Sequence, residues 1–397
     1  MKILMLTPYL PYPLLSGGQI RTYNLLKKLK DKYEITLFSF IRKDGEKIHI
    51  KELEKFCYKV KVFKRRPAWS FKNVLIAGFS PFPFVMISTY LSLKARKAIS
   101  QELRTGNYDL IHAEPFYMTP NIPLTKIPIL LVEQTIEYLV YKKYVDNFKF
   151  KFLKPFLYFD VLKLKFWEEF FWRQASSLAA MSGEDKKIMA KVAPKKNIDV
   201  VANGVDIEFF NQAKMKKPKV PTVLFVGNFK WLPNKDAAKF LTFEIWPLIK
   251  KKIPQAKLWI VGKNPTPEIL SLGGKKDVLV DSHVKDIRVA FGEASVLLAP
   301  IRNGRGTKYK VLEAMATKLP VVTTPLGIEG IEAKTESEVL VGNGAKNLAE
   351  LTVRLLKTPE LGQRLVSSAY KMIEDKYSWD LISANLDKVY QRLGKKA

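Results

Sequence analysis

A short segment near residue 303 combines glycines, cations and one carboxylate, the residue types that bind phosphate groups. Glycine lets backbone N–H groups approach an anion closely, and lysine and arginine add full positive charges. The segment NGRGTKYKVLEAMA contains Gly304, Arg305, Gly306, Thr307, Lys308 and Lys310. It is not a Walker A loop, which requires GxxxxGK[ST] after a strand. The simplest ligand for this pattern is a diphosphate.

Glu313 follows in the same segment, within an apolar pattern typical of a helix. One interpretation is structural, because a carboxylate early in a helix interacts favourably with the helix dipole or with a nearby lysine. The other is functional, because acidic residues in nucleotide-binding α/β domains accept hydrogen bonds from ribose hydroxyls. The residues alone leave both interpretations open.

The elements around this segment explain how it would be positioned. The apolar run SVLLAPI (295–301) predicts a strand, and Val311, Leu312 and Met315 predict a helix that begins near Thr307. The glycine-rich loop therefore lies at the carboxyl end of a strand and the N-terminus of a helix. Open α/β sheets bind their ligands at such positions.

Similar apolar runs alternate with helical patterns along the whole chain, in two series. The first series of predicted strands is 2–7, 34–40, 58–63, 109–114, 127–133, 177–182 and 198–203. The second series is 222–228, 256–263, 277–282, 295–301, 319–324 and 338–342. Near-continuous apolar strands separated by helices are typical of parallel sheets covered on both faces. The fold class is therefore α/β, with two doubly wound Rossmann-like domains.

A polar, lysine-rich segment (203–221) separates the two series and has the composition of a linker. We expect an N-terminal domain over 1–205 and a C-terminal domain over 206–377. The helical pattern at the C-terminus has apolar residues at the spacing of one helix face. We expect residues 378–397 to pack back on the N-terminal domain.

Composition restricts the function classes. The chain has 397 residues, a formal net charge of +29, one cysteine (Cys57) and three histidines. A single cysteine excludes an internal disulfide framework, and this content makes a metal site unexpected. No apolar run is long enough to span a bilayer, so we expect a cytoplasmic protein. The positive charge predicts an anionic partner: nucleic acid, an acidic membrane surface or a phosphorylated ligand.

The segment GTKYKVLEAMATKLPVVTTPLGIEGI (306–331) resembles the nucleotide-sugar motif of GT-B glycosyltransferases, in particular the retaining family 4, or group 1, enzymes. Further segments follow in the order typical of that family: YDLIHAEP (108–115), ANGVDIEFF (202–210), VLFVGNFKWLPNKDA (223–237) and AKLWIVGKNP (256–265). The resemblance implies transfer of a sugar from a nucleotide diphosphate sugar to an acceptor hydroxyl, with retention and without a metal or other cofactor. It implies a GT-B architecture in which the two domains face each other across a cleft.

The resemblance also implies roles for single residues in the C-terminal domain. Glu313 matches the second glutamate of the family's E-x7-E motif, which holds the ribose hydroxyls. The first glutamate is replaced by Arg305, so the sugar identity does not transfer from the family. A phosphate clamp of arginine and lysine in many relatives is replaced by Asn228 and Asn234. The remaining residues implied in donor binding are Gly227, Lys230 and Val284, with Lys308 and Lys310 as the cations at the diphosphate.

In the N-terminal domain, Gly17 and Gly18 match a loop that approaches the phosphate or the acceptor, and Arg21 follows one turn later. His112 matches a family histidine, and Glu114 stands at a position that is often histidine. Both are candidates for a general base, although a histidine at a strand end is more often structural. Catalysis in such enzymes rests on positioning and on stabilising the departing diphosphate, and that role would involve Lys308.

Two segments suggest an anionic membrane surface as a partner. Residues 149–174 interleave aromatic residues with lysines, and KRRPAWSFK (64–72) is a compact basic patch. Such a surface binds anionic lipid, which implies a peripheral protein on the inner face of the plasma membrane and a saccharide or lipid-linked acceptor. The alternative is that these helices bury their apolar faces in the core and expose solvated lysines.

Three other functions fit parts of the sequence. A nicotinamide oxidoreductase also uses doubly wound sheets, but the first strand-to-helix turn lacks GxGxxG. A nucleic-acid-binding protein would use the same charge, yet no nucleic-acid module motif is present, so we expect no nucleic acid partner. A GT-B sugar-nucleotide epimerase shares the fold and would convert the donor without an acceptor.

Overall fold

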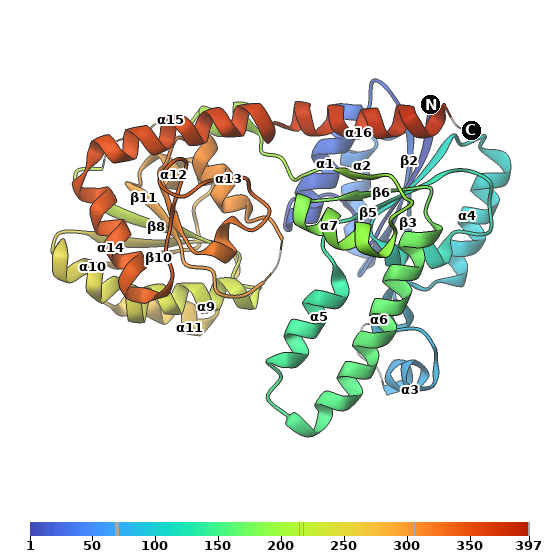
Figure 1. Cartoon of the computed structure of the whole chain (residues 1–397), viewed down its shortest axis with the longest axis horizontal. Helices are drawn as coiled ribbons and strands as arrows, with labels where there is room; N and C mark the ends of the chain where they lie inside the picture. The colour runs from blue at the N-terminus through green and yellow to red at the C-terminus, as the bar shows by residue number, and fades with distance from the viewer. Residues whose placement is uncertain (68–70, 214, 217, 305, 396–397) are drawn as a thin grey trace. The chain divides into compact units, whose positions relative to one another are not determined.

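The computed structural model describes residues 1–67, 71–213, 215–216, 218–304 and 306–395. Its contacts divide the chain into two compact units. Unit 1 comprises Met1–Ala202 and Ile382–Ala397, and unit 2 comprises Asn203–Leu381. Each unit contains one parallel sheet with helices packed around it (Figure 1).

The sheet of unit 1 has seven strands in the order β3-β2-β1-β4-β5-β6-β7. They are β1 (Lys2–Thr7), β2 (Glu34–Ile41), β3 (Lys59–Lys64), β4 (Leu110–Ala113), β5 (Ile129–Glu133), β6 (Ser177–Ala180) and β7 (Ile198–Val200). The central strands are covered on both faces, and Ile3 through Leu6 of β1 are fully buried. The strand order reverses between β1 and β4, which makes this the switch point where such sheets bind ligands.

Helices connect these strands. They are α1 (Gly17–Leu29), α2 (Ile50–Leu53), α3 (Phe71–Phe79), α4 (Leu93–Thr105), α5 (Glu137–Asp146), α6 (Lys154–Gln174) and α7 (Gly183–Val192). Ser16 caps α1, because its side chain accepts a hydrogen bond from the Gln19 backbone N–H. Helix α6 buries Val161, Leu164, Glu168 and Trp172, a spacing that places them on one face.

The sheet of unit 2 has six strands in the order β10-β9-β8-β11-β12-β13. They are β8 (Thr222–Val226), β9 (Lys257–Val261), β10 (Val278–Asp281), β11 (Val296–Ala299), β12 (Val321–Thr323) and β13 (Leu340–Val341). The order reverses between β8 and β11, the second switch point. All thirteen strands lie where the apolar runs predict them, and all are parallel, so the predicted α/β fold class is confirmed.

The helices of unit 2 begin with α8 (Ile207–Asn211) and end with α16, which continues into unit 1. The others are α9 (Leu232–Phe240), α10 (Trp246–Lys252), α11 (Pro267–Leu270), α12 (Ile287–Gly292), α13 (Tyr309–Ala316), α14 (Gly344–Lys357) and α15 (Pro359–Lys376). Helix α16 spans Trp379–Gly394, and its residues from Ile382 onward group with unit 1.

The polar segment predicted as a linker packs on unit 2. The Arg288 guanidinium lies 4.1 Å from the centre of the Phe209 ring, and the Lys216 backbone N–H donates to the Gly292 carbonyl at 2.9 Å. Val205 forms a parallel bridge with Ser378. The composition of this segment predicted a linker, and these contacts attach it to unit 2.

In the part of the chain that the structure describes, no helix has the length and hydrophobicity needed to cross a bilayer.

Candidate functional site

In unit 2, the glycine-rich loop and Glu313 lie at the switch point between β8 and β11. The loop follows β11, and α13 begins at Tyr309, close to the predicted helix start. Gly304 has a φ of +91° and Gly306 a φ of +84°, both in the left-handed region where glycine is favoured. The backbone conformation at these two positions therefore favours glycine. Arg305 lies outside the described residues.

The segment that follows β8, on the other side of the switch point, holds the Lys310 side chain in place. Its amine donates to the Asn234 side-chain oxygen at 2.7 Å and lies 4.5 Å from the centre of the Phe225 ring. The Asn234 amide in turn donates to the Asn228 carbonyl at 2.9 Å, and Asn264 donates to the Asn228 side-chain oxygen at 3.0 Å. Asn234, and Asn228 through it, thus orient a cation in the first turn of α13.

Lys310 and Glu313 are both partly buried and lie within electrostatic range of each other. Burial lowers the pKa of Lys310 to about 7, although the charge of Glu313 opposes this shift. Burial raises the pKa of Glu313 to about 7, and the charge of Lys310 opposes that shift. A bound ligand that presents hydroxyl donors to Glu313 and an anion to Lys310 would favour both charged forms.

Two further side chains of this loop differ in their contacts. The Thr307 hydroxyl is buried and has no hydrogen-bond partner among the described residues. The Lys308 amine donates to the Gly306 carbonyl at 2.5 Å, which fixes the turn before α13. Among the described residues, the Thr307 hydroxyl thus has unused hydrogen-bonding capacity, and Lys308 stabilises the turn before α13.

Gly227 directly follows β8 and packs against the Asn234 side chain, which would lie 3.0 Å from an added Cβ. Lys230 is exposed nearby, and Val284 lies partly buried between β10 and α12. Contact of Gly227, Lys230 and Val284 with the donor remains a prediction.

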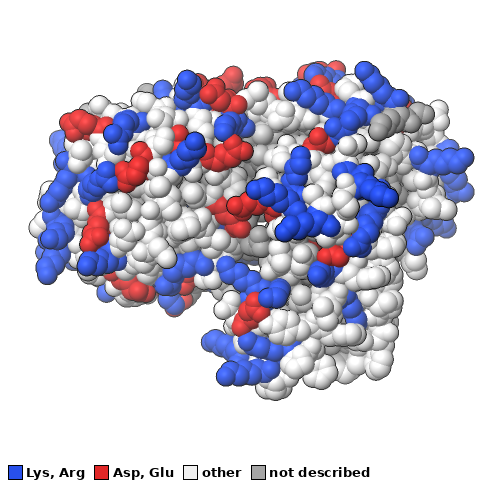
Figure 2. Space-filling model, in the orientation of Figure 1, with Lys and Arg blue, Asp and Glu red and all other residues white. Residues whose placement is uncertain are grey.

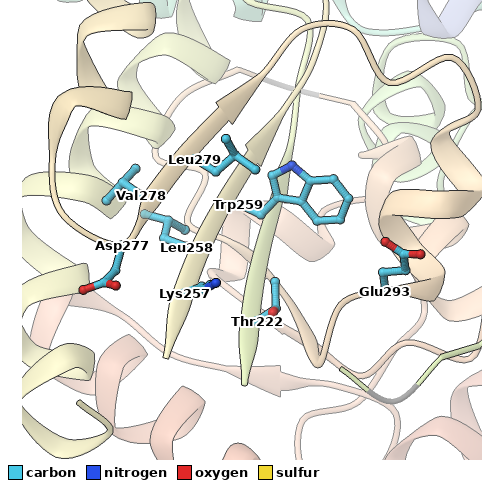
Figure 3. A pocket seen from close by; sticks show the side chains of 8 residues that line it. All are labelled: Thr222, Lys257, Leu258, Trp259, Asp277, Val278, Leu279 and Glu293. Carbon is cyan, nitrogen blue, oxygen red and sulfur yellow. The ribbon is translucent and has the colours of Figure 1, made fainter. Parts of the chain in front are cut away.

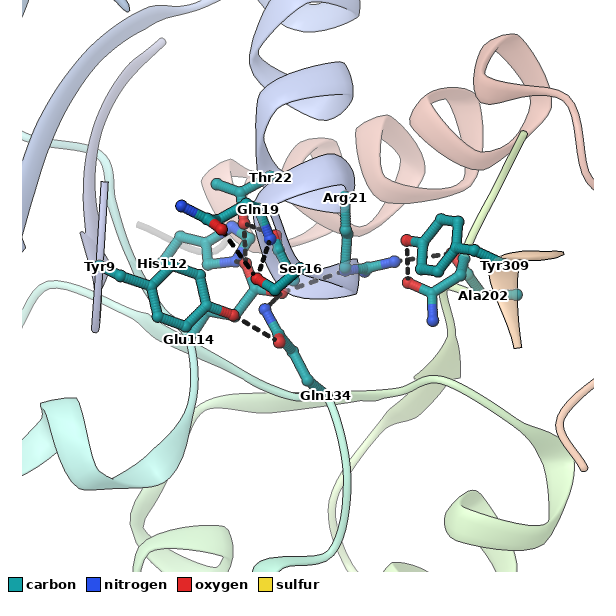
Figure 4. Close-up of polar contacts among 12 residues, drawn as sticks. Tyr9, Ser16, Gln19, Arg21, Thr22, His112, Glu114, Gln134, Ala202 and Tyr309 are labelled. Atoms are coloured by element: carbon teal, nitrogen blue, oxygen red, sulfur yellow. Dashed lines mark hydrogen bonds and ion pairs between the residues drawn. The ribbon is translucent and has the colours of Figure 1, made fainter. Parts of the chain in front are cut away.

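In unit 1, the predicted residues Arg21, His112 and Glu114 come together at the switch point between β1 and β4 (Figure 4), and Gly18 lies next to Tyr9 and Gln134. Gly17 and Gly18 form the first turn of α1. An added Cβ at Gly18 would lie 1.8 Å from the Tyr9 hydroxyl and 2.3 Å from a Gln134 oxygen. Glycine is needed here because these side chains pack against the helix N-terminus.

Arg21 and Glu114 form a fully buried ion pair. Arg21 Nε lies 3.0 Å from Glu114 Oε1, and Arg21 Nη1 donates to the Ala202 carbonyl at 2.6 Å. Gln134 donates to Glu114 at 3.1 Å and accepts from the Tyr9 hydroxyl at 3.0 Å. Arg21 was predicted to bind substrate, but its side chain is 0% exposed and is used to hold the loops at this switch point together.

The surroundings of Glu114 determine its proton affinity. Burial alone raises the pKa of the carboxyl, but the interaction with His112, the charge of Arg21 and the Gln134 hydrogen bond outweigh burial and lower it to about 2. A carboxylate with so low a pKa is a weak base at neutral pH. This argues against Glu114 as the general base.

His112 is also fully buried, on β4. Its Nδ1 lies 2.5 Å from the Tyr390 hydroxyl of α16, and its Nε2 lies 3.6 Å from Glu114 Oε2, beyond hydrogen-bond range. The Nε2 atom has no hydrogen-bond partner among the described residues. The observed contact with Tyr390 fits the structural role that is common for a histidine on a buried strand.

Glu137 is a candidate that sequence reasoning missed. It lies in the first turn of α5, directly beyond the carboxyl end of β5, and burial raises its pKa to about 7. Its backbone N–H and that of Tyr138 donate to the buried Glu168 carboxylate at 2.8 and 2.9 Å, which fixes this helix N-terminus. The sequence signal that could have identified Glu137 is its position shortly after a predicted strand. Gln134 has the same signal, so the signal alone does not single out Glu137.

The hollow in Figure 3 is a different feature. It has a volume of about 580 Å³ and is lined by residues near the amino ends of β8, β9 and β10, among them Lys257, Trp259 and Leu279. The predicted donor site lies at the carboxyl ends of the strands. Among the described residues, no group of three or more His, Cys, Asp or Glu side chains is arranged to hold a metal ion.

Comparison with known proteins places these features in one family. Residues 15–209 match the model of Glycosyltransferase Family 4, and residues 220–358 match that of Glycosyl transferases group 1. A Klebsiella pneumoniae protein described as an uncharacterized 44.6 kDa protein in the cps region is 22% identical, over 95% of this chain and 96% of its own. The Staphylococcus aureus capsular polysaccharide biosynthesis glycosyltransferase CapM is 25% identical, over 53% of this chain and 60% of its own.

Solved structures share the fold over the whole chain. Sucrose-phosphate synthase from Thermosynechococcus elongatus has a TM-score of 0.71 at 15% identity and covers 100% of both chains. Anabaena HepE in complex with UDP-glucose has a TM-score of 0.64 at 14% identity, covering 99% of this chain and 100% of its own. With both units matched by family models and the whole chain matched in fold, this protein belongs to the group 1, family 4 glycosyltransferases and has the GT-B fold.

Proposed function

We propose that this glycosyltransferase transfers a sugar from a nucleotide diphosphate sugar to an acceptor hydroxyl with retention of anomeric configuration. The observation that carries the proposal is that Glu313 and Lys310 lie within electrostatic range of each other at the switch point of unit 2. The Glu313 carboxylate has no side-chain hydrogen-bond partner among the described residues, and Lys310 is oriented by its hydrogen bond to Asn234. A nucleoside diphosphate supplies both complements: ribose hydroxyls that donate to a carboxylate, and phosphates that bind a cation.

The departing diphosphate develops negative charge during transfer. The N-terminus of α13, the backbone N–H groups of the glycine-rich loop and Lys310 can stabilise that charge without rearrangement. Thr307 adds a hydroxyl donor in the same loop. In unit 1, Glu137 lies in the first turn of α5, beyond the carboxyl end of β5, and burial raises its pKa to about 7, so it is a candidate to receive the acceptor's proton.

The relatives suggest the class of donor and the pathway. One structural neighbour was solved with UDP-glucose, and CapM is described as acting in capsular polysaccharide biosynthesis. We infer a UDP-sugar as the first donor to test, and a saccharide or lipid-linked saccharide of a cell-surface polysaccharide as the acceptor. The protein would act in the cytoplasm, at the inner face of the plasma membrane.

A thermal-shift screen across UDP-, GDP- and other nucleotide sugars tests the donor site. We expect one nucleotide class to raise the melting temperature, with a gain of about 2.7 kcal/mol at a ligand concentration of about 100 Kd. Glu313→Gln should weaken binding by roughly tenfold or more, because it removes charge-assisted hydrogen bonds.

Glu360→Gln is the matched control, because Glu360 is an exposed carboxylate in the first turn of another helix, α15. Binding that is unchanged in Glu313→Gln would overturn the ribose role. The absence of binding to any nucleotide sugar would overturn the proposed donor class.

A further inference from the structure

Three helices of unit 1 form a projection with an unusually apolar surface. Helices α5 and α6 lie side by side and extend away from the sheet, and α3 lies against α6 (Figure 1). We use "the projection" for α3, α5, α6 and the connection 147–153. On the face in Figure 2, the projection is largely uncharged, with lysines toward its tip.

The tip of the projection exposes phenylalanines. Phe150, Phe152 and Phe156 are 58%, 72% and 76% exposed. The rings of Tyr144, Phe148, Phe150 and Phe152 follow one another at centroid distances of 5.6, 5.9 and 6.1 Å. Ring packing gives this apolar surface a defined shape although it faces solvent.

The exposed surface continues along α6 and onto α3. Along α6, Phe159, Leu162 and Phe166 are exposed at helical spacing, on the side opposite to the buried stripe. On α3, Phe71 and Phe79 are 79% and 93% exposed, and the large apolar side chains of Val74, Leu75 and Ile76 between them are also exposed. A soluble helix normally exposes polar residues, so a continuous apolar side on both helices indicates an interaction surface.

Polar contacts fix α3 to α6, so the two apolar faces form one surface. The Lys163 amine donates to the Ala77 and Ser80 carbonyls at 2.8 and 2.7 Å. The Trp167 indole donates to the Pro81 carbonyl at 2.9 Å, and its ring stacks on Phe82 at 4.6 Å. The aromatic and basic segment 149–174 was singled out in the sequence, but the participation of α3 follows only from the structure.

The charge on the projection has one predominant sign. Residues 142–166 contain seven lysines and two aspartates. Asp160 accepts a hydrogen bond from the Phe84 backbone at 2.9 Å, and Asp146 is paired with Lys142. Lys149 and Lys151 are exposed and alternate with the tip phenylalanines.

We propose that the projection is a docking surface for an anionic lipid bilayer. Phenylalanines enter the boundary between headgroups and acyl chains, and the neighbouring lysines bind lipid phosphates. Interfaces between proteins are depleted in lysine, so the alternation of lysine and phenylalanine favours lipid over a protein partner. The proposal rests on the proposed function, because docking would bring the enzyme to a lipid-linked acceptor.

Vesicle co-sedimentation of the full chain tests the proposal. We expect binding to vesicles of phosphatidylcholine mixed with phosphatidylglycerol at low salt, and weaker binding to phosphatidylcholine alone. Phe152→Ser with Phe156→Ser should lower partitioning by about tenfold or more. The matched control is Leu93→Ser with Leu124→Ser, since these leucines are 78% and 104% exposed outside the projection.

A second pair of variants separates charge from apolar contact. Lys149→Gln with Lys151→Gln should weaken binding to anionic vesicles and reduce its salt dependence, whereas Lys346→Gln with Lys371→Gln on unit 2 should not. Failure of the wild-type protein to bind anionic vesicles at low salt would overturn the proposal. A dimer in sedimentation velocity that is lost in Phe152→Ser with Phe156→Ser would also overturn it, because a second copy would then cover the surface.

The thermal-shift screen with nucleotide sugars distinguishes a failure of the docking proposal from a failure of the proposed function. Phe152→Ser with Phe156→Ser should retain the thermal shift given by the nucleotide sugar. Vesicle binding without any nucleotide-sugar binding would contradict the proposed function and leave the docking surface supported. Nucleotide-sugar binding without vesicle binding would contradict the docking surface and leave the proposed function supported.

Discussion

Replacing Arg21 by Met tests whether the buried ion pair holds unit 1 together. Both side chains are 0% exposed, so the substitution leaves the Glu114 charge buried and removes the donor to the Ala202 carbonyl. Breaking a buried pair from one side costs about 3–5 kcal/mol. For a unit of this size, each kcal/mol lowers the melting temperature by about 2–4 °C, so we expect a decrease of roughly 6–20 °C.

Calorimetry at pH 7 measures this effect, with Lys27→Met on the same helix as the control. The double variant Arg21→Met with Glu114→Gln should recover part of the loss, because it leaves no unpaired charge. The low pKa of Glu114 adds a pH test. Its stabilising contribution should be complete above the unfolded value near 4.5 and lost as the pH falls toward about 2. A melting temperature for Arg21→Met within about 2 °C of the wild type would show that the ion pair does not hold unit 1 together.

Three other predictions concern titratable groups. Donor affinity should peak near pH 7, because protonation of Glu313 weakens binding at lower pH and deprotonation of Lys310 weakens binding at higher pH. In calorimetric titrations, Glu313→Gln should abolish the decrease of affinity below pH 7 and keep the decrease above it. Burial and the charge of Glu168 raise the pKa of Glu133, so the protonated carboxyl that stabilises the folded state is lost as the pH rises. The Glu133→Gln side chain stays neutral and can still accept the Trp172 hydrogen bond, so the variant should be stabilised relative to the wild type by more at pH 8 than at pH 5. Equal stabilisation at the two pH values would contradict this. Glu137→Gln should lower kcat by about 10²–10⁴-fold with unchanged donor affinity, and steady-state kinetics with normal kcat would exclude it as the base.

The strands and the position of the glycine-rich loop were largely predictable from the sequence. Continuous apolar runs predicted all thirteen strands, because parallel strands are buried on both faces. The glycine-rich loop was located for the same reason: it directly follows the β11 strand. Glu313 lies one turn into the following helix, as its apolar pattern predicted.

Features that depend on tertiary contacts were not predictable. Arg21 is one cation among many in the sequence, and only the approach of β4 makes it the partner of a buried carboxylate. The segment 203–221 has a polar composition, yet Phe209 and Lys216 attach it to unit 2. Helix α3 is apolar without a periodic pattern that reveals its exposed face. In each case the decisive neighbour lies far away in the sequence.

Proton NMR of a reaction with the selected nucleotide sugar and a panel of simple glycosides tests the central claim most directly. We expect the donor's anomeric signal to disappear, nucleoside diphosphate to be released, and a new glycoside to appear with the donor's anomeric configuration. A product of opposite configuration would contradict retention. Conversion of the donor into another nucleotide sugar, without release of diphosphate or need for an acceptor, would contradict transfer and indicate an epimerase.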